Sequence, residues 1–460
     1  MAESNERARQ ISSASIQELA KGEVDMASRA LSAHRERTPL RRVIMASLIG
    51  TTIEWYDFFL YGSAAALVFN RLFFPQYDPL TGTLLAFATY AVGFFARPVG
   101  GIVFGHYGDR MGRKRLLMLS LVLMGVATVL IGLLPTYAAI GVWAPIGLIV
   151  LRLIQGFAIG GEWGGAVLMA AEHGDDARRG FWTSWPQAGV PAGNLLAAAL
   201  LALMAGIQTE AEFLEWGWRV PFLMSALLVA VGWYIRNRVT ESPLFEQALA
   251  TEPPPNLPAI DVLRERPRAL LLGAGLKFGE NISGYILFVF TLTYLVELVG
   301  ESRGLALNAL VLGAAVQFFA IPGFALLSDR IGRRPVYAFG AFGLAAFSFL
   351  LFPLLGSGDT LSIYVALVVG LFLHGAMYGP QAAFIIELFP TRTRYSGVSI
   401  ATQLTSIVAG SLAPIVAIWL YREYGSATPI AVYVATACLI SGVSALLARE
   451  TKGVELAAIK

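Results

Sequence analysis

Two carboxylates stand inside an apolar stretch near the start of the chain. Glu54 and Asp57 lie in the apolar run 43–68, and their i, i+3 spacing places them on one face of a helix. In hydrocarbon each charge would cost about 2.5–3.5 kcal/mol, so these groups must face a wet cavity, pair with a cation or hold a proton. A carboxylate that gains and loses a proton can couple transport to protons, and both residues are candidates for that role. The alternative is a structural salt bridge.

Basic residues stand at comparable depth in other apolar runs. Arg97 and Arg152 lie within the runs 81–105 and 143–169. Either arginine is a candidate partner for the carboxylates or a candidate site for an anionic substrate, because a guanidinium can hold a carboxylate by two parallel hydrogen bonds. Arg97 also lies close enough to a charged loop to be structural. Glu162, set among four glycines that predict close helix packing, is a third candidate proton site.

Further polar side chains inside apolar runs are candidates for binding a solute. Lys277 and Glu280, at i, i+3, can neutralise each other, and Asn281 and Tyr285, at i, i+4, share a stripe. His374 can titrate near neutral pH, with a hydrogen-bonded packing role as the alternative. Besides the two arginines, the predicted substrate-binding residues are Gln155, Gln187, Asn194, Lys277, Glu280, Asn281, Tyr285, His374, Tyr378 and Gln381, and Gln317 is a further cavity candidate.

A charged turn occurs twice in the chain. Residues 105–115 read GHYGDRMGRKR and residues 328–334 read SDRIGRR, and Asp329 stands 220 positions after Asp109. A second pair, EHGDDARRG at 172–180 and ELFPTRTRYSG at 387–397, repeats at an offset of 215. Offsets near half the chain length predict two similar halves. An acid in such a turn can accept from the backbone donors of a helix N-terminus or pair with an arginine of the other half.

We predict that these loops form a gate on the cytoplasmic side. Their basic residues alone would also satisfy the rule that cytoplasmic loops are positively charged, whereas the repeated acid is not required by that rule. The predicted gate residues are Gly105, Asp109, Arg110, Gly112, Arg113, Glu172, Arg178, Asp329, Arg330, Arg333, Glu387 and Arg394.

The elements that must position these side chains are membrane helices. The 460-residue chain is 56% hydrophobic and 14% charged, whereas a soluble domain carries about 25% charged residues. A spanning helix needs about 20 mostly apolar residues. We expect twelve such helices, at 43–68, 81–105, 116–134, 143–169, 181–206, 217–236, 269–298, 305–327, 336–355, 361–387, 396–420 and 429–448.

The loops between these runs predict the orientation. With the N-terminus inside, the inner loops hold sixteen basic residues and the outer loops four, which is the bias of the positive-inside rule. The polar start of the chain does not read as a signal peptide, and the single cysteine, Cys438, excludes an intramolecular disulfide. The predicted parts are a cytoplasmic tail at 1–40, six-helix bundles at 41–236 and 269–448, a proline-rich cytoplasmic linker at 237–268 and a cytoplasmic tail at 449–460.

Several motifs together resemble a known family. The charged turn and its degenerate copy are similar to the signature loops of the major facilitator superfamily. IEWYDFFLYG at 53–62, RLIQGFAIGGEWGGA at 152–166 and GWRVPF at 217–222 resemble its metabolite:proton symporter branch, which includes carriers for proline/betaine, α-ketoglutarate, citrate and shikimate. The resemblance covers about residues 41–450. It implies twelve helices in two pseudo-symmetric bundles, with charged turns that latch the cytoplasmic side in the outward-open state.

Two features depart from the family pattern. The second charged turn has Ala325 where the first has Gly105, so we expect a less close helix approach there. Ten residues follow Glu450, which leaves no room for the long coiled-coil tail of the osmosensing proline/betaine carriers. We therefore do not expect an osmosensor, although betaine remains open as a substrate.

These observations predict a secondary transporter in the cytoplasmic membrane of a bacterium. We expect it to import a small carboxylate-bearing metabolite, such as a dicarboxylate, an α-keto acid or a shikimate-like acid, with a proton by alternating access. A zwitterionic osmolyte such as proline or betaine is the alternative substrate, and a solute sensor that does not transport is a more distant alternative. The expected partners are the metabolite, protons and the lipid bilayer, and we expect a functional monomer.

Other functional classes have little support in the sequence. No metal cluster, phosphate loop or nucleophile elbow can be recognised, so we expect no enzymatic activity, no metal and no cofactor. The basic residues lie on alternate loops instead of on one stripe, which argues against a nucleic-acid partner.

Overall fold

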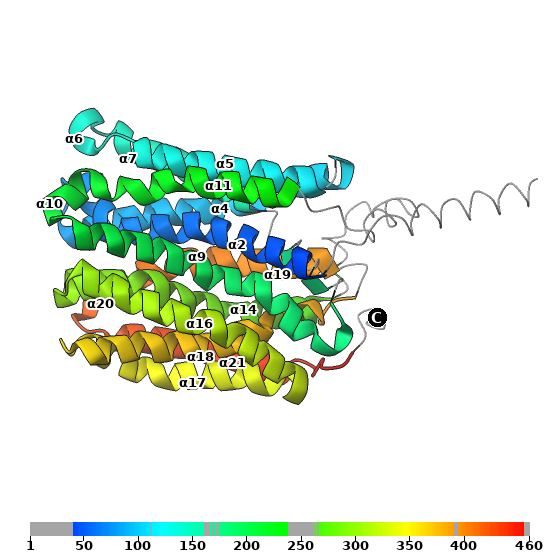
Figure 1. Cartoon of the computed structure of the whole chain (residues 1–460). Coiled ribbons are helices and arrows are strands. Elements are labelled where there is room, and N and C mark those ends of the chain that lie inside the picture. The colour runs from blue at the N-terminus through cyan, green and yellow to red at the C-terminus, as the bar shows by residue number, and fades with distance from the viewer. Residues whose placement is uncertain are drawn as a thin grey trace, which may run out of the picture. The chain divides into compact units, whose positions relative to one another are not determined.

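The protein is helical throughout the part of the chain that the structure describes (Figure 1). This computed structural model describes residues 40–111, 113–160, 166–167, 170–171, 174–237, 262, 264, 266–390 and 394–454, without the side chains of 102, 104–117, 236–237, 395–396 and 404. Contacts join the described residues from Val43 onward into one compact unit.

The helices of the first half follow the apolar runs, because a helix satisfies its backbone groups internally where no water is present. They are α2 (Leu40–Ala64) with η1 (Ala65–Phe69) and α3 (Asn70–Leu72), α4 (Pro79–Met111), α5 (Arg113–Leu133), α6 (Tyr137–Ile140), α7 (Trp143–Ile159), η2 (Asp176–Arg178) with α9 (Arg179–Ile207), α10 (Glu210–Glu212) with η3 (Phe213–Gly217), and α11 (Arg219–Asn237).

The second half repeats this pattern of long helices. They are α14 (Pro267–Tyr285) with η4 (Ile286–Phe290), α15 (Thr291–Thr293) and η5 (Tyr294–Val299), α16 (Arg303–Ile331), α17 (Arg333–Leu355), α18 (Thr360–Ile386), α19 (Arg394–Thr405) with η6 (Ser406–Gly410) and α20 (Ser411–Tyr424), and α21 (Thr428–Leu447).

Most of these helices are long and apolar enough to cross a membrane. Within the described residues nine qualify, and a tenth is added if Glu210–Gly217 and Arg219–Ile235, bent by 42°, form one broken span. Two shorter apolar helices, Met118–Leu133 and Trp143–Ile159, stand between them. The helices begin and end within six residues of the expected runs, except that the run 143–169 extends partly outside the described residues.

Glycines determine how closely α7 approaches α4. A Cβ at Gly156 would lie 1.9 Å from the carbonyl oxygen of Gly93, and one at Gly160 would lie 2.1 Å from that of Arg97. Any larger residue would force these helices apart. The close packing that the glycines predict is therefore confirmed at Gly160, and the same contact fixes the backbone that carries Arg97.

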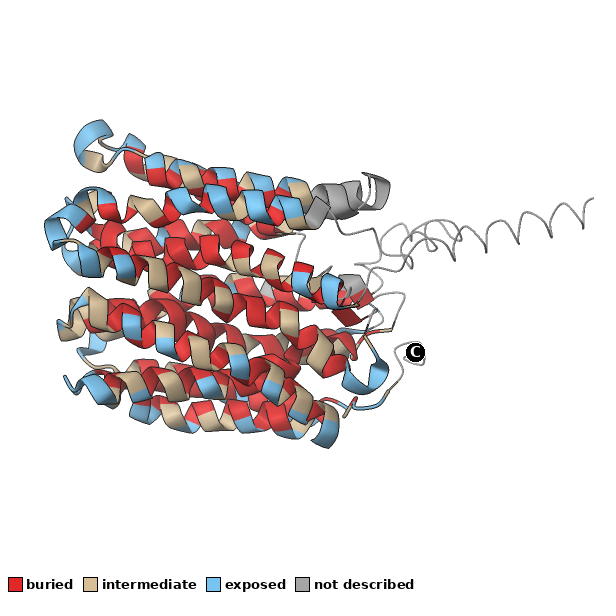
Figure 2. Ribbon diagram, viewed as in Figure 1, coloured by how far each residue is buried: buried red, intermediate tan, exposed pale blue. Residues whose placement is uncertain are grey.

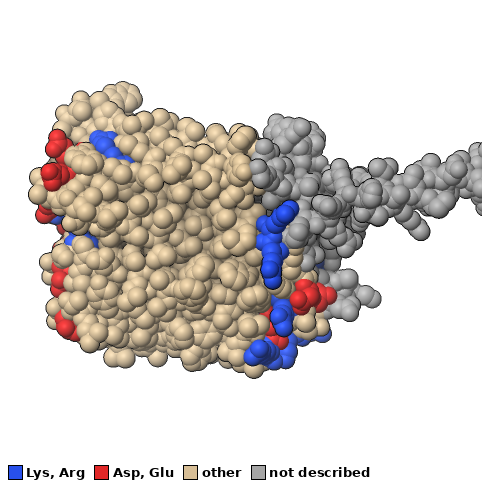
Figure 3. Space-filling view, in the orientation of Figure 1, with Lys and Arg blue, Asp and Glu red and all other residues tan. Residues whose placement is uncertain are grey.

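Helices far apart in the sequence lie side by side. α9 packs against α16 and α18, and α4 packs against α20, so residues from both halves of the chain share one interior (Figure 1). Figure 2 shows that buried residues run along the middle of the long helices. Figure 3 shows the charged side chains of the described residues at the two ends of the visible face, with an uncharged band between them. This is the distribution that a hydrocarbon layer favours.

The helix that begins with α14 changes its winding at the centre of the molecule. The π-helix η4 starts directly after Tyr285, and the hydroxyl of Thr291 donates to the carbonyl oxygens of Ile286 and Leu287 at 2.8 and 2.9 Å. Such π segments are frequent at functional sites. Because its hydrogen bonds run from i to i+5 instead of i+4, this segment changes the relative directions of Tyr285 and Phe288, both of which line the central cavity.

Candidate functional site

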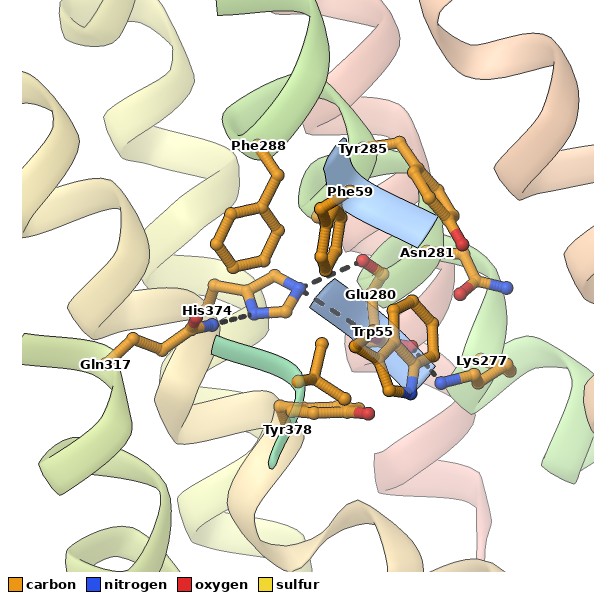
Figure 4. Close-up of a pocket in the computed structure, with 12 residues that line it drawn as sticks. Trp55, Phe59, Lys277, Glu280, Asn281, Tyr285, Phe288, Gln317, His374 and Tyr378 are labelled. Carbon is orange, nitrogen blue, oxygen red and sulfur yellow. Dashed lines mark hydrogen bonds and ion pairs between the residues drawn. The ribbon is translucent and has the colours of Figure 1, made fainter. Parts of the chain in front are cut away.

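A cavity lies between helices of the first and second halves. Its walls come from α2, α9, α14, η4, α16 and α18 (Figure 4). The open space at its centre is about 30 Å³, room for about two water molecules, so the walls are nearly closed on each other. Trp55, Phe59, Val190 and Phe288 form the apolar part of the wall. The polar part consists of Lys277, Glu280, Asn281, Tyr285, Gln317, His374 and Tyr378.

The polar wall contains a connected chain of side chains (Figure 4). Lys277 Nζ lies 2.6 Å from Glu280 Oε2 and 3.1 Å from Gln381 Oε1. His374 Nε2 lies 3.1 Å from the carbonyl oxygen of Glu280 and 3.7 Å from Glu280 Oε1. Gln317 Nε2 lies 2.6 Å from His374 Nδ1. The ion pair that the spacing of Lys277 and Glu280 predicts is therefore confirmed, and both residues are at most 7% exposed.

The hydrogen bonds of His374 fix its tautomer. A carbonyl oxygen can only accept, so the 3.1 Å contact with the carbonyl oxygen of Glu280 places a ring proton on Nε2, while Nδ1 faces the amide of Gln317. A Cβ at Gly284 would lie 3.0 Å from Nε2, so this glycine leaves room for the ring. His374 is thus both hydrogen-bonded, as one interpretation expects, and part of the cavity wall, as the other expects.

Two buried arginines lie beside aromatic rings of the first half. The guanidinium carbon of Arg152 lies 4.5 Å from the ring centre of Phe58, 4.6 Å from that of Tyr61 and 4.5 Å from that of Tyr90. The guanidinium carbon of Arg97 lies 4.6 Å from the ring centre of Phe58. Cation–π attraction of this kind strengthens when the groups are desolvated, so the rings hold both cations in place without neutralising them.

Part of each guanidinium group has no hydrogen-bond partner. Arg152 donates from Nε to the carbonyl oxygen of Tyr90 at 3.3 Å and from Nη1 to Gln155 at 3.0 Å. Its Nη2, and Nε and Nη2 of Arg97, are buried without a partner among the described residues. Tyr285, which lines the cavity, stacks edge-on against Phe94 at 5.5 Å, and neither arginine is part of the cavity wall. Unpaired buried donors of this kind are what an anionic group would satisfy.

Asp57 is buried in the first half and does not face lipid. It is 1% exposed and accepts a 2.6 Å hydrogen bond from Ser225 of α11. Within the described residues no ion pair joins it to either arginine, so the arginine partner considered above is not found. Gln155 donates to Thr128 at 2.7 Å, and the Thr128 hydroxyl, which itself donates to the carbonyl oxygen of Met124 at 3.0 Å, lies beside Asp57.

Three other predicted residues are buried away from the cavity wall. Glu54 of α2 is 5% exposed, and Gln187 and Asn194 of α9 are fully buried. Asn194 has no hydrogen-bond partner for either side-chain atom among the described residues. Gln381 touches the site only through Lys277, while Glu162 lies outside the described residues.

One end of the molecule is closed by an ion cluster, here named the Arg179 cluster, of Arg179, Asp329, Arg333 and Glu387. Arg179 Nη1 lies 2.8 Å from Glu387 Oε1, and Arg333 lies 2.5 Å from Asp329 and 3.4 Å from Glu387. The carboxylate of Asp329 also accepts from the backbone nitrogens of Gly180 and Phe181, both at 2.9 Å. An acid that caps the N-terminus of a helix in the other half is one of the two contacts expected for the charged turns.

The segment after α21 lies across the same end. The carboxylate of Glu450 accepts from the backbone nitrogens of Arg333 and Arg334 at 2.9 and 3.0 Å. Thr451 donates to Glu387, and Arg179 donates to the carbonyl oxygen of Val454 at 3.1 Å. The segment therefore holds the start of α17 and the Arg179 cluster together.

The opposite end has a second cluster, here named the Arg71 cluster, of Arg71, Glu210, Glu297 and Arg303. Glu210 lies 2.8 Å from Arg71 and 3.2 Å from Arg303, and Glu297 lies 3.7 Å from Arg71. These contacts again join the two halves. Since α9 has 29 residues between Arg179 and Ile207, the two clusters are about 40 Å apart.

Several predicted gate residues take other positions. Arg178 is exposed and only its backbone nitrogen is held, by Asp175. Arg394 donates to the carbonyl oxygen of Phe389 at 3.2 Å, and Arg330 uses its carbonyl oxygen to accept from Lys452. Gly112 and Glu172, and the side chains of Asp109, Arg110 and Arg113, lie outside the described residues, and of Gly105 only the backbone, within α4, is described.

Sequence reasoning missed some residues of both clusters and of the cavity. It named Arg178 for the gate, whereas the neighbouring Arg179, the first residue of α9, makes the ion pairs. It did not name Trp55 among the cavity residues, although this ring lines the cavity. The basic residues of the Arg71 cluster were counted only as charges in the loops, and its acidic residues were not named. Two acids and two bases spread over three connecting regions of the chain are the signal that was available for pairing.

Comparison with known proteins decides the family. The model of the Major Facilitator Superfamily matches residues 47–414 and, in a second match, 281–458. The chain belongs to the major facilitator superfamily. The shikimate transporter of Escherichia coli (strain K12) is 42% identical over 420 residues, covering 90% of this chain and 95% of that protein. The inner membrane metabolite transport protein YhjE of the same organism is 40% identical, covering 92% and 98%.

Solved structures support the same fold. The crystal structure of a D-xylose-proton symporter matches with a TM-score of 0.70 and 19% identity, over 90% of this chain and 99% of that one. The relatives are those of the metabolite:proton symporter branch that the motifs indicate. This member of the superfamily is therefore a multi-pass transporter of the bacterial inner membrane that handles small metabolites, and it is not an enzyme.

Proposed function

We propose that this transporter is a symporter that imports a small carboxylate-bearing metabolite together with a proton. The observation that carries the proposal is the guanidinium of Arg152, which is fully buried with Nη2 unpartnered among the described residues. A buried cation without a counter-ion is costly. An anionic substrate would compensate this cost through charge-assisted hydrogen bonds, with Arg97 as the second donor.

The proposed architecture is twelve spanning helices in two bundles. The first bundle comprises 41–236 and the second 269–448, with a cytoplasmic linker at 237–268 and both termini in the cytoplasm. The bias of basic residues to alternate loops supports this orientation. It makes the Arg179 cluster cytoplasmic and the Arg71 cluster periplasmic, and it places the cavity near the middle of the membrane in a single functional monomer.

Alternating access would proceed by breaking one cluster at a time. Both clusters join the two halves, and the cavity between them has room for only about two waters, which is the arrangement of an occluded state. Opening the Arg71 cluster would admit the metabolite, and opening the Arg179 cluster would release it. A carrier changes state only through differential affinity, so proton and metabolite must each bind the two states differently.

Asp57 and Glu54, with Glu162, are the proposed proton carriers of the first half. Asp57 is buried and lies beside Thr128, which accepts from Gln155, the hydrogen-bond partner of Arg152. Protonation of Asp57 changes the number of hydrogen bonds it accepts, and this change reaches Arg152 through these neighbours. Proton binding and anion binding would thereby be coupled within one bundle.

Uptake into reconstituted vesicles tests the proposal. We expect an imposed pH gradient, at zero membrane potential, to accumulate shikimate, α-ketoglutarate or citrate, and a protonophore to abolish the accumulation. Accumulation that survives the protonophore would contradict proton drive. Accumulation of proline or betaine but of none of the acids would show that the substrate is a zwitterionic osmolyte instead of an organic acid. Binding without uptake would indicate a sensor.

A further inference from the structure

The cavity wall contains a hydrogen-bond acceptor that no described residue satisfies. Gln317 of α16 lines the cavity and is fully buried, and its Oε1 has no hydrogen-bond partner among the described residues. We propose that this oxygen selects a hydroxyl group of the metabolite, so that the substrate is a hydroxylated carboxylic acid. This inference rests on the proposed function, because it takes the cavity as the place where a carboxylate-bearing metabolite binds.

A chain of hydrogen bonds determines which end of the Gln317 amide is free (Figure 4). The carbonyl oxygen of Glu280 can only accept, so it takes the proton of His374 Nε2 at 3.1 Å. In the neutral ring Nδ1 is then the acceptor, and the amide presents Nε2 to it at 2.6 Å. The amide oxygen is thereby directed away from His374 and remains available for a donor.

Packing of α16 against α18 holds the side chain of Gln317 in this position. A Cβ at Gly375 would lie 3.1 Å from the Cβ of Ala320 and 3.5 Å from the Cγ of Gln317, so this glycine lets the two helices approach closely around the glutamine. A buried acceptor that is left without a donor is costly. A ligand hydroxyl that reaches Oε1 removes this cost.

The charges of the wall favour a hydroxyl over an ammonium group as the donor. The acid among the described lining residues, Glu280, is already paired with Lys277 at 2.6 Å. The ammonium group of proline would therefore add a positive charge without a counter-ion of its own, which is costly in a buried site. Betaine has no N–H or O–H donor, and α-ketoglutarate has none outside its carboxyl groups. Shikimate and citrate carry hydroxyl groups in addition to carboxylates, and the substrate class is narrowed to acids of this kind.

A hydroxyl at Gln317 and a carboxylate at the arginines would hold the metabolite at two points. Tyr285 lines the cavity, and its hydroxyl lies beside Arg97. Gln317 contributes a different part of the wall, from α16 instead of α14 (Figure 4). An acid without a hydroxyl would engage the arginines and leave Oε1 of Gln317 unsatisfied, so hydroxylation of the acid would determine how tightly it binds.

Matched ligands and the variant Gln317→Met test the proposal. Cyclohexene carboxylate has the ring and the carboxylate of shikimate but no hydroxyl groups, and tricarballylate is citrate without its hydroxyl. We expect the native protein to bind shikimate or citrate more tightly than the matched ligand. In Gln317→Met, which keeps the length of the side chain without its acceptor, the affinity for the hydroxylated acid should fall about 3- to 10-fold, the factor for one neutral hydrogen bond. The affinity for the matched ligand should not change. Titration calorimetry of the purified protein in detergent measures these dissociation constants.

Two further variants keep the test decisive. Gln208 also has a side-chain oxygen that is buried without a partner among the described residues, but it follows the last residue of α9 and lies outside the cavity wall. Gln208→Met is therefore expected to keep the native ratio of the two dissociation constants. Should Gln317→Met fail to fold, Gln317→Asn withdraws the oxygen by one methylene while it keeps an amide, and the same fall in the ratio is expected.

A purely structural role of Gln317 would change the affinity for both members of a ligand pair alike. An unchanged ratio in the Gln317 variants, or equal affinities for the two ligands in the native protein, would therefore overturn this inference. Binding of α-ketoglutarate without binding of shikimate or citrate would also overturn it and would leave the proposed function intact. Failure of the native protein to bind any of these three acids would instead contradict the proposed function.

Discussion

The rings around Arg152 favour a planar guanidinium over any other cation. Three ring centres lie within 4.6 Å of its central carbon, and two of its nitrogens already donate to Tyr90 and Gln155. Lysine keeps the positive charge but lacks the planar group and the paired N–H donors of a guanidinium. We expect Arg152→Lys to weaken shikimate binding about 10- to 100-fold, the factor that corresponds to about 1.5–3 kcal/mol for a hydrogen bond to a charged group. Titration of the purified protein measures this change.

A second arginine of similar surroundings provides the control. Arg219 lies 4.5 Å from the ring centre of Trp218 and donates to the carbonyl oxygens of Gly132 and Leu134, outside the cavity wall. Arg219→Lys is expected to lower stability without changing shikimate affinity. Equal affinity in the native protein and Arg152→Lys would show that Arg152 has only a packing role.

At the residue scale, the sequence identifies the candidate site residues more reliably than it identifies the residues that they contact. Apolar residues on both sides of an ionisable residue predict that its side chain is buried. The i, i+3 spacing of Lys277 and Glu280 predicts their ion pair. The contact of His374 with Gln317 joins α18 to α16, and no spacing along one helix encodes it. The choice of Arg179 over Arg178 depends on where α9 begins, and a shift of one residue turns a side chain by about 100°.

At the element scale, the segment after α21 acts as a cap for α17. The carboxylate of Glu450 accepts four backbone hydrogen bonds, from Arg333, Arg334, Thr451 and Lys452. Partial desolvation raises the pKa of Glu450, but these four donors outweigh it, so the pKa is lowered overall. Folding therefore favours the ionised form, and the resulting stability is complete above the unfolded pKa of about 4.3. It is lost as the pH falls through the lower folded value.

The variant Glu450→Gln removes this ionisable cap. We expect it to lower the free energy of unfolding at neutral pH by about 0.5–2 kcal/mol, in the lower part of that range because the carboxylate is half-exposed. The difference from the native protein should shrink below about pH 4. Thermal unfolding in detergent over a pH series measures it, with Glu423→Gln as an exposed control. A difference that stays constant down to pH 3 would show that ionisation of Glu450 contributes nothing.

Helices are the part of the fold that the sequence encodes most directly. Long apolar runs place nearly every helix to within a few residues, since a spanning segment has no other way to satisfy its backbone. The π segments were not predicted. In η4 the π winding coincides with a Thr291 hydroxyl that donates to two backbone carbonyl oxygens of the segment, and this contact depends on local packing that hydropathy does not record.

At the scale of the whole molecule, the two ends are closed by contacts of different strength. In the Arg179 cluster the side chains of Arg179 and Glu387 are at most 1% exposed. In the Arg71 cluster the side chain of Arg71 is 43% exposed and that of Glu210 is 64% exposed. Exposed ion pairs contribute about 0–1 kcal/mol and are screened by salt, whereas buried pairs are screened much less. We therefore expect the Arg71 end to open before the Arg179 end.

Salt concentration tests this asymmetry. Raising it from about 0.1 M to about 1 M shortens the Debye length from about 10 Å to about 3 Å. With the single cysteine replaced by Cys438→Ala, a cavity label at Phe59→Cys reports access from each side through its rate of reaction with an impermeant maleimide. We expect salt to raise the rate several-fold from the side of the Arg71 cluster and to change it little from the other side. In Arg71→Gln the rate from that side should already be high and should no longer respond to salt. Equal acceleration from both sides would mean that burial of the Arg179 cluster does not govern which end opens, and the order of opening would then have to come from helix packing.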